Sequence, residues 1–497
     1  MKLLNWLPLL FIVLISLVYS YNANHSDCDF VTFQMYRMVH NNIHHPEVTN
    51  YLSMVHPAKA DDIYLYSSML TPGASLYHTL FCKLAGLSVF SLRLSSVLIY
   101  SFIFLGLMYV SKNLGFRYNE PLWLYFLAPG VILFAPACEM WLTSIPPIIF
   151  MIGLLIDKRP IKLKWLYFFL LSFCAVWFIF TLYVYIIFLF LAFAILDFFN
   201  QNKQEPLCSR KIIISVLCGG FLAILLGLIQ QVWAPDGTMD YFSYFKLRAS
   251  HRVGGASNVL SLYPYMMTRL WSFLSQQYPL FILTLISIGL IAFSDRKLRD
   301  RNEKILGISM FIYLAYLGLF AKTTIHHYFF SYFFLLLTPP LFLYAYRKRG
   351  SKKVGWVEII FLLIISISGL YEIRKTNFWV NQRNDIDTFL ENMSNKDYLL
   401  RDTPFNTWPL NLNAPEKTLY IDVNQRSNQL KDLDRRIVSS YAVTQNTIYY
   451  APQFFNHESK TLIPQGSALY MITKEPLDNH QIIYQDRGYY IIKLLEK

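Results

Sequence analysis

The sequence has few charged residues for its length. Asp, Glu, Lys and Arg make up 15% of the 497 residues, whereas a soluble domain carries about 25%. So little charge excludes an ordinary soluble globular protein. The apolar residues stand in uninterrupted blocks of about 20, long enough to cross the hydrocarbon core of a bilayer. The composition therefore predicts a polytopic α-helical membrane protein.

Cysteine is also scarce. The six cysteines are scattered, and residues 373–497 contain none. This distribution excludes a secreted disulfide scaffold, and no spacing indicates a zinc site. Residues 373–497 also lack a phosphate-binding loop and a nucleophile elbow, so this part of the chain is predicted to be an accessory or acceptor-recognition domain.

The net charge of +13 reflects membrane topology rather than a nucleic-acid-binding surface. Twenty of the 44 Lys and Arg lie in Lys2 and five short loops, whereas the alternate loops hold nine. By the positive-inside rule, the N-terminus and these five loops are cytoplasmic, and the C-terminal domain lies outside. The five loops are 112–117, 158–164, 203–211, 296–304 and 347–353.

The apolar blocks predict about eleven transmembrane helices within residues 1–372. Two long external loops, 21–90 and 234–278, interrupt them, and residues 75–87 of the first loop are amphipathic. The expected spans are 3–20, 92–111, 121–137, 141–156, two within 165–199, 212–233, 279–294, 305–321, 328–346 and 355–372. The block 165–199 is too long for one span, so a tight turn is expected near 181–185. The first span is interpreted as an uncleaved helix rather than a signal peptide, because no small-residue cleavage site lies near 18–21.

Beyond the last span the pattern changes. Short β-rich runs alternate with helical ones, which predicts a small α/β domain over residues 373–497. The expected strands are 398–400, 418–423, 468–473, 481–484 and 489–494, and the expected helices are 385–393 and 427–437.

Ionisable side chains are almost absent from the predicted spans and collect in the external loops and turns. Transporters and pumps usually carry such residues in the middle of a span. The distribution instead indicates a reaction site at the outer membrane–water boundary.

Four stretches carry a family resemblance. They are Ser26-Asp27-Cys28-Asp29-Phe30 after the first span, Thr71-Pro72-Gly73-Ala74-Ser75-Leu76-Tyr77 with the following Lys83-Leu84-Ala85-Gly86 and Phe90-Ser91-Leu92-Arg93-Leu94-Ser95-Ser96, Glu139-Met140-Trp141-Leu142, and His326-His327-Tyr328 before Pro339-Pro340. With this layout the chain resembles the GT-C superfamily of polyprenyl-phosphate-sugar glycosyltransferases, in the branch of the protein O-mannosyltransferases and the lipid A aminoarabinose transferase. Two departures stand out: the family's double proline is Pro72-Gly73 here, and its Asp-Glu pair is replaced by Asp-Cys-Asp-Phe.

The resemblance implies that a sugar moves from a polyprenyl-phosphate carrier to an acceptor lipid, glycan or protein on the external face. A carboxylate within hydrogen-bond reach can make the acceptor nucleophilic. Asp29 is the expected base, with Asp27 and Glu139 as further candidates. The simpler interpretation is a solvated loop residue for each Asp and a helix cap for Glu139. Asp61 and Asp62, later in the same loop as Asp29, are interpreted as solvated loop residues.

The departing phosphate gains negative charge and needs fixed positive groups or donors near it. The candidates on the external side are Arg248, Arg252, Lys322, His326, His327 and Tyr328. The alternative for the basic residues is an ordinary attraction to anionic lipid headgroups. Asp27 and Asp29 also resemble a divalent-metal pair, and no other cofactor is indicated.

The sequence leaves two functions other than an enzyme to consider. A transporter or flippase of lipid-linked saccharides would show inverted repeats and polar residues at mid-membrane, and the sequence shows neither. A receptor or assembly scaffold would leave the external acids and bases without a shared purpose. The expected location is a bacterial inner membrane with a periplasmic C-terminal domain. The expected partners are the lipid-linked sugar, its acceptor and membrane lipids, without nucleic acid.

Overall fold

The computed structural model describes the chain in segments. These are residues 72–87, 89–116, 140–180, 182–199, 206–232, 300–320 and 340–345, the strands given below, and single residues near 6–14, 35–46, 289 and 337. The predicted spans at 121–137 and 355–372 lie outside the described residues, as does nearly all of the span at 279–294.

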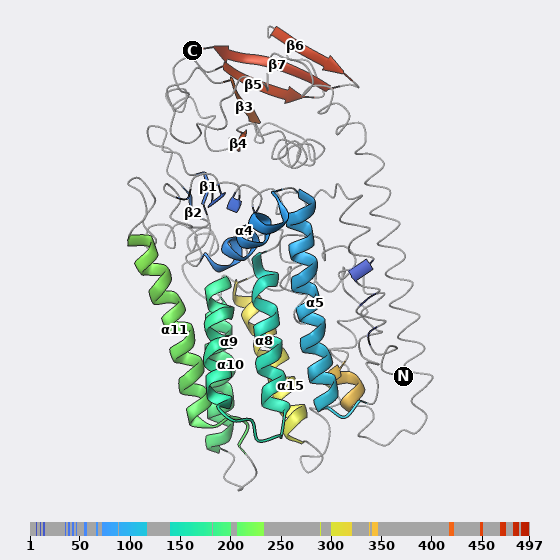
Figure 1. Cartoon of the computed structure of the whole chain (residues 1–497), viewed down its shortest axis with the longest axis vertical. Coiled ribbons are helices and arrows are strands. Elements are labelled where there is room, and N and C mark those ends of the chain that lie inside the picture. Colours follow the sequence, from blue (N-terminus) through green and yellow to red (C-terminus); the bar gives the residue numbers. More distant parts are fainter. Residues whose placement is uncertain are drawn as a thin grey trace.

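Helices packed side by side form the main body, and one short helix lies across an end of this bundle (Figure 1). The bundle contains α5 (Val89–Asn113), α8 (Met140–Ile156), α9 (Lys164–Phe178), α10 (Leu182–Phe199), α11 (Arg210–Val232) and α15 (Arg301–Phe320), and the short helix is α4 (Gly73–Ala85). Three described segments are long and apolar enough to cross a membrane: Phe90–Asn113, Leu182–Phe199 and Arg210–Gln230.

The apolar block 165–199 forms two helices, as its length predicts. α9 ends at Phe178 and α10 begins at Leu182. In the tight turn between them the Leu182 amide donates to the Ile179 carbonyl at 3.2 Å, and the Tyr183 amide to the Phe180 carbonyl at 2.9 Å. The turn begins slightly earlier than expected. Both helices are hydrophobic up to their ends, so hydropathy does not show where one helix stops and the next begins.

α15 begins four residues before the span expected at 305–321, because its first turn is polar and reciprocally capped. The Asp300 carboxylate accepts the Glu303 amide at 2.9 Å, and the Glu303 carboxylate accepts the Asp300 amide at 3.4 Å. This arrangement is a capping box, which satisfies amide groups that the helix itself cannot.

Close backbone contact joins α9 to α11. A Cβ atom built on Gly219 would lie 2.3 Å from the Phe169 carbonyl oxygen, so only glycine allows the two helices to approach this closely. Next to it, the Ser172 hydroxyl donates to the Val216 carbonyl at 2.7 Å. The interior between α10 and α15 is aromatic instead, with the buried rings of Tyr185 and Tyr313 in edge-to-face contact at 5.1 Å.

At one end of the bundle, Arg301 joins three segments. Its guanidinium donates to the carbonyl of Leu155 at 2.7 Å, of Pro206 at 3.2 Å and of Leu207 at 3.0 Å. These bonds connect the last turn of α8, the approach to α11 and the start of α15. Three of the basic loops named above therefore meet at one end, called here the basic end, as the charge distribution predicts.

The strands belong to two sheets. β1 (Met54–His56) and β2 (Tyr66–Ser67) form an antiparallel pair within the first long loop. The other sheet has the order β4-β3-β5-β7-β6 and contains β3 (Lys417–Ile421), β4 (Ile448–Tyr450), β5 (Ala468–Thr473), β6 (Gln481–Asp486) and β7 (Tyr489–Glu496). β3 runs parallel to β4 and β5, whereas β7 is antiparallel to β5 and β6. In Figure 1 this sheet lies beyond α4, away from the basic end.

The larger sheet contains strands at four of the predicted places, 418–423, 468–473, 481–484 and 489–494. β4 was not expected from the sequence. The expected strand at 398–400 and helices at 385–393 and 427–437 lie outside the described residues. The boundary of a separate domain at residue 373 stays a prediction.

Candidate functional site

The residues predicted to carry the chemistry lie outside the described part of the chain. They are Asp27, Asp29, Glu139, Arg248, Arg252, Lys322, His326, His327 and Tyr328. Described residues next to Glu139, to loop 234–278 and to Lys322 are nevertheless informative. Met140 begins α8, Val232 ends α11 and Phe320 ends α15, and the other ends of these three helices meet at the basic end. Met140, Val232 and Phe320 therefore belong to the opposite end of the bundle, where α4 lies (Figure 1).

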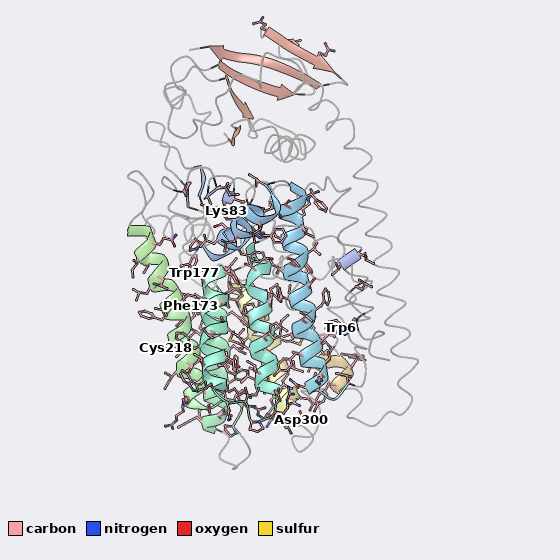
Figure 2. All side chains as sticks on the ribbon, in the orientation of Figure 1. Trp6, Lys83, Phe173, Trp177, Cys218 and Asp300 are labelled. Atoms are coloured by element: carbon pink, nitrogen blue, oxygen red, sulfur yellow. The ribbon has the colours of Figure 1, made fainter. Side chains whose placement is uncertain are left out.

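α4 is an amphipathic helix, as residues 75–87 predict. One face is buried against the bundle and consists of Gly73, Ala74, Ser75, His78, Thr79 and Cys82. The opposite face exposes Leu80, Lys83 and Leu84, and Figure 2 labels Lys83 at this end of the bundle. Buried positions three to four residues apart are the pattern of a helix that covers a core.

Gly73 presses the start of α4 onto α9. A Cβ atom at this position would lie 2.5 Å from the Trp177 ring and 2.6 Å from the Trp177 carbonyl oxygen. The Trp177 ring is itself stacked on Phe173, with centroids 5.7 Å apart (Figure 2). A second proline after Pro72 would not fit here, which gives a physical reason for the Pro72-Gly73 departure from the family pattern.

His78 is fully buried in the contact between α4 and α5. Its Nδ1 lies 2.5 Å from the Ser95 hydroxyl oxygen, and that hydroxyl donates its own proton to the Leu92 carbonyl at 2.5 Å. Ser95 can therefore only accept from His78, which assigns the proton to Nδ1 and leaves Nε2 as an acceptor. Burial lowers the pKa of His78 to about 3, so the ring is neutral.

Asn42 links the first long loop to the same place. Its amide donates to the Thr79 hydroxyl at 3.3 Å, and that hydroxyl donates to the Ser75 carbonyl at 2.7 Å. We call Asn42, Ser75, His78, Thr79 and Ser95 the α4 polar cluster. Among the described residues, the Asn42 Oδ1 and His78 Nε2 atoms are buried without a hydrogen-bond partner. Both are acceptors, so they suit a water or a hydroxyl group and not an anion.

His78 is not among the site residues predicted from the sequence. It could have been found, because it falls among the buried positions of an amphipathic helix. A buried histidine without a hydrogen bond destabilises the fold, so a histidine at such a position is expected to have a partner. What the cluster does chemically is limited: it is neutral and contains no carboxylate. Its evident effect is to fix Asn42, in the earlier part of the first long loop, against α4, and α4 against α5.

The basic end contains a second polar group of side chains. Tyr109 donates to Asp157 Oδ2 at 2.6 Å, and Arg159 pairs with the same oxygen at 2.6 Å. The Arg159 guanidinium holds the pKa of Asp157 well below its usual range. No group of three His, Cys, Asp or Glu side chains suited to a metal ion occurs within the described segments.

Comparison with known proteins gives one clear result. No protein-family model matches the sequence, and no curated protein matches it. Among solved structures, ArnT from Cupriavidus metallidurans bound to undecaprenyl phosphate superposes with a TM-score of 0.55 and 10% identity, over 98% of this chain and 97% of that chain. The chain has the fold of ArnT. The apo state of ArnT from the same organism matches with a TM-score of 0.50 and 9% identity, over the same shares of the two chains.

The ArnT likeness confirms the predicted resemblance to the GT-C superfamily at the level of the fold. Together with the apolar helices, it supports an integral membrane protein. The likeness extends over nearly all of both chains, so it includes residues on both sides of position 373. At 10% identity it transfers an architecture and not the role of any residue.

Proposed function

We propose that this chain is a glycosyltransferase that moves a sugar from a polyprenyl-phosphate-linked donor to an acceptor on the external face of the membrane. The observation that carries the proposal is the likeness over 98% of the chain to ArnT bound to undecaprenyl phosphate. A chain of this architecture thus holds a polyprenyl phosphate. No observation on the described residues favours the transporter or flippase alternative.

In the proposed reaction, an acceptor hydroxyl attacks the anomeric carbon of the sugar. Asp29 takes the hydroxyl proton, with Asp27 or Glu139 as the alternative base. The bond between the anomeric carbon and the phosphate oxygen breaks, and the polyprenyl phosphate departs with the bonding electrons. Its charge is balanced by donors among Arg248, Arg252, Lys322, His326, His327 and Tyr328. Arginine suits this task because its planar fork can hold two phosphate oxygens.

The α4 polar cluster supports this assignment of the reacting end. Through Asn42 it ties the first long loop, in which Asp27 and Asp29 lie, to α4 and α5. The described residues next to Glu139, to loop 234–278 and to Lys322 belong to the same end of the bundle. In this proposal residues 1–372 are the catalytic domain and residues 373–497 recognise the acceptor outside the membrane.

The test compares three strains that express wild type, Asp29→Asn or Asp62→Asn. Asparagine has nearly the shape of aspartate but cannot take the proton, and general-base help is worth about 10²–10⁴ in rate. Asp62→Asn is the matched control, since it removes the same charge from the same loop. Mass spectrometry of glycolipids and glycoproteins should show one glycoform in the wild type and the control, and its loss in Asp29→Asn at equal protein level.

Two results would count against parts of this proposal. Normal product in Asp29→Asn moves the base to Asp27 or Glu139. Identical glycolipids and glycoproteins with and without the whole gene refute the glycosyltransferase assignment itself.

A further inference from the structure

The α8–α9 turn, residues 157–164, has an unusual combination of features. Leu163 has φ of 54°, in the left-handed region, and its side chain is 57% exposed. Leucine rarely adopts this conformation, because its Cβ atom then crowds the following carbonyl oxygen. The turn therefore holds an apolar side chain outward in a backbone conformation that must be supported by its surroundings.

The turn buries its acid and exposes three of its four cations, Lys158, Arg159 and Lys162. The Asp157 side chain is 2% exposed, and it accepts hydrogen bonds from Tyr109 and from the side chain and amide of Arg159. Lys164 donates to the Asp157 carbonyl at 2.9 Å. Lys158 and Lys162 are exposed, so the outer surface of the turn is positively charged.

The neighbouring helices extend this surface. The ammonium group of Lys211, in the first turn of α11, lies 5.1 Å from the centre of the Trp165 ring. Tyr167, one turn into α9, is 51% exposed. Exposed leucine and tyrosine beside lysines at the end of an apolar helix match the boundary between lipid tails and headgroups.

We propose that the α8–α9 turn is a binding site for an anionic phospholipid, with Lys158, Lys162 and Lys211 around the headgroup phosphate and Leu163 and Tyr167 against the lipid chains. The site lies at the basic end, opposite the end proposed for sugar transfer. Leu163 favours a lipid over a soluble anion, because an exposed apolar side chain can be buried against lipid chains but not against a dissolved phosphate. The proposal does not depend on the glycosyltransferase assignment.

The experiment uses the purified full-length chain in nanodiscs of phosphatidylcholine with phosphatidylglycerol as the minor lipid. Native mass spectrometry then measures which lipids stay bound to the released protein. Lys158→Gln/Lys162→Gln should lower the preference for phosphatidylglycerol by about fivefold for each cation removed. The matched control is Lys112→Gln/Lys304→Gln, which removes two charges from α5 and α15 at the same end and should lower the preference much less.

The variant Leu163→Asn tests the apolar contact independently of charge. Asparagine accepts the left-handed conformation, so the turn keeps its shape while the apolar tip is lost. Retention of phosphatidylglycerol should fall although no charge has changed. Inorganic phosphate in excess should not displace the bound lipid.

Four results would overturn the proposal. Equal losses in the two double variants would show a diffuse attraction to the whole basic end. Full retention in Leu163→Asn, or displacement by inorganic phosphate, would show a simple anion site. Wild type without any preference for phosphatidylglycerol would exclude the site altogether.

Discussion

Replacing His78 with asparagine should make the protein less sensitive to mild acid. In the folded protein His78 is neutral, because burial lowers its pKa to about 3 from an ordinary value of 6.5. Asparagine cannot titrate, but its side-chain amide can take the place of Nδ1 and donate to Ser95. The variant therefore keeps the hydrogen bond and removes the titration.

The direction and size follow from proton linkage. A histidine whose folded pKa is depressed contributes stability that is fully present above about pH 6.5 and is lost as the pH falls towards 3. Between pH 7 and pH 5 the unfolded chain binds most of one proton at this residue and the folded chain binds none. At 1.36 kcal/mol per pKa unit, the wild type should lose about 2 kcal/mol more than the variant over this interval.

Equilibrium unfolding in denaturant at pH 7 and pH 5, with both proteins in the same detergent, measures this difference. The cavity left by the smaller side chain lowers the stability of the variant at both pH values and so cancels from the comparison. Equal losses in the wild type and His78→Asn between pH 7 and pH 5 would refute a neutral, buried His78.

Three further predictions concern packing and topology. Gly219→Ala should lower the free energy of unfolding by about 1–3 kcal/mol, because its methyl group meets a backbone oxygen of α9, whereas Cys218→Ala, an exposed neighbour, should have little effect in the same denaturant titration. Arg301→Ala removes three hydrogen bonds to backbone carbonyls and should cost about 2–4 kcal/mol, a value discounted for its partial exposure, and Arg301→Lys should not restore it. In a cysteine-free background, Gly350→Cys and Lys460→Cys should react with an impermeant reagent from opposite sides of the membrane, and labelling from the same side would refute the topology.

For the helices that the structure describes, hydropathy alone gave the bounds within a few residues, because a bilayer-spanning helix is apolar on every side and needs no tertiary information to be recognised. α8 was expected at 141–156 and begins at Met140, and α11 was expected at 212–233 and runs from Arg210 to Val232. The error is largest where a helix starts with polar residues. α15 is the example, because its capping box adds a turn that carries no hydropathy signal.

The contacts between distant segments were not predictable in the same way. Arg301 was interpreted as one charge among several in a basic loop, and its bond to Leu155 spans 146 positions. β4 has three residues, too few for a recognisable sequence pattern, and it is defined by its pairing with β3. The Gly73 contact with Trp177 likewise depends on how α4 is seated, although the Pro72-Gly73 departure was visible in the sequence.

The bonds made by Arg301 have a mechanical consequence. They join α8, α15 and the approach to α11 at their basic ends through hydrogen bonds from a single side chain. Because these three segments are joined at their basic ends, we expect any separation of the helices to be largest at their far ends, beside α4. A long lipid tail that slips between these helices would therefore enter from the α4 side, and the width of that opening would be set by small tilts of rigid helices rather than by unwinding any of them.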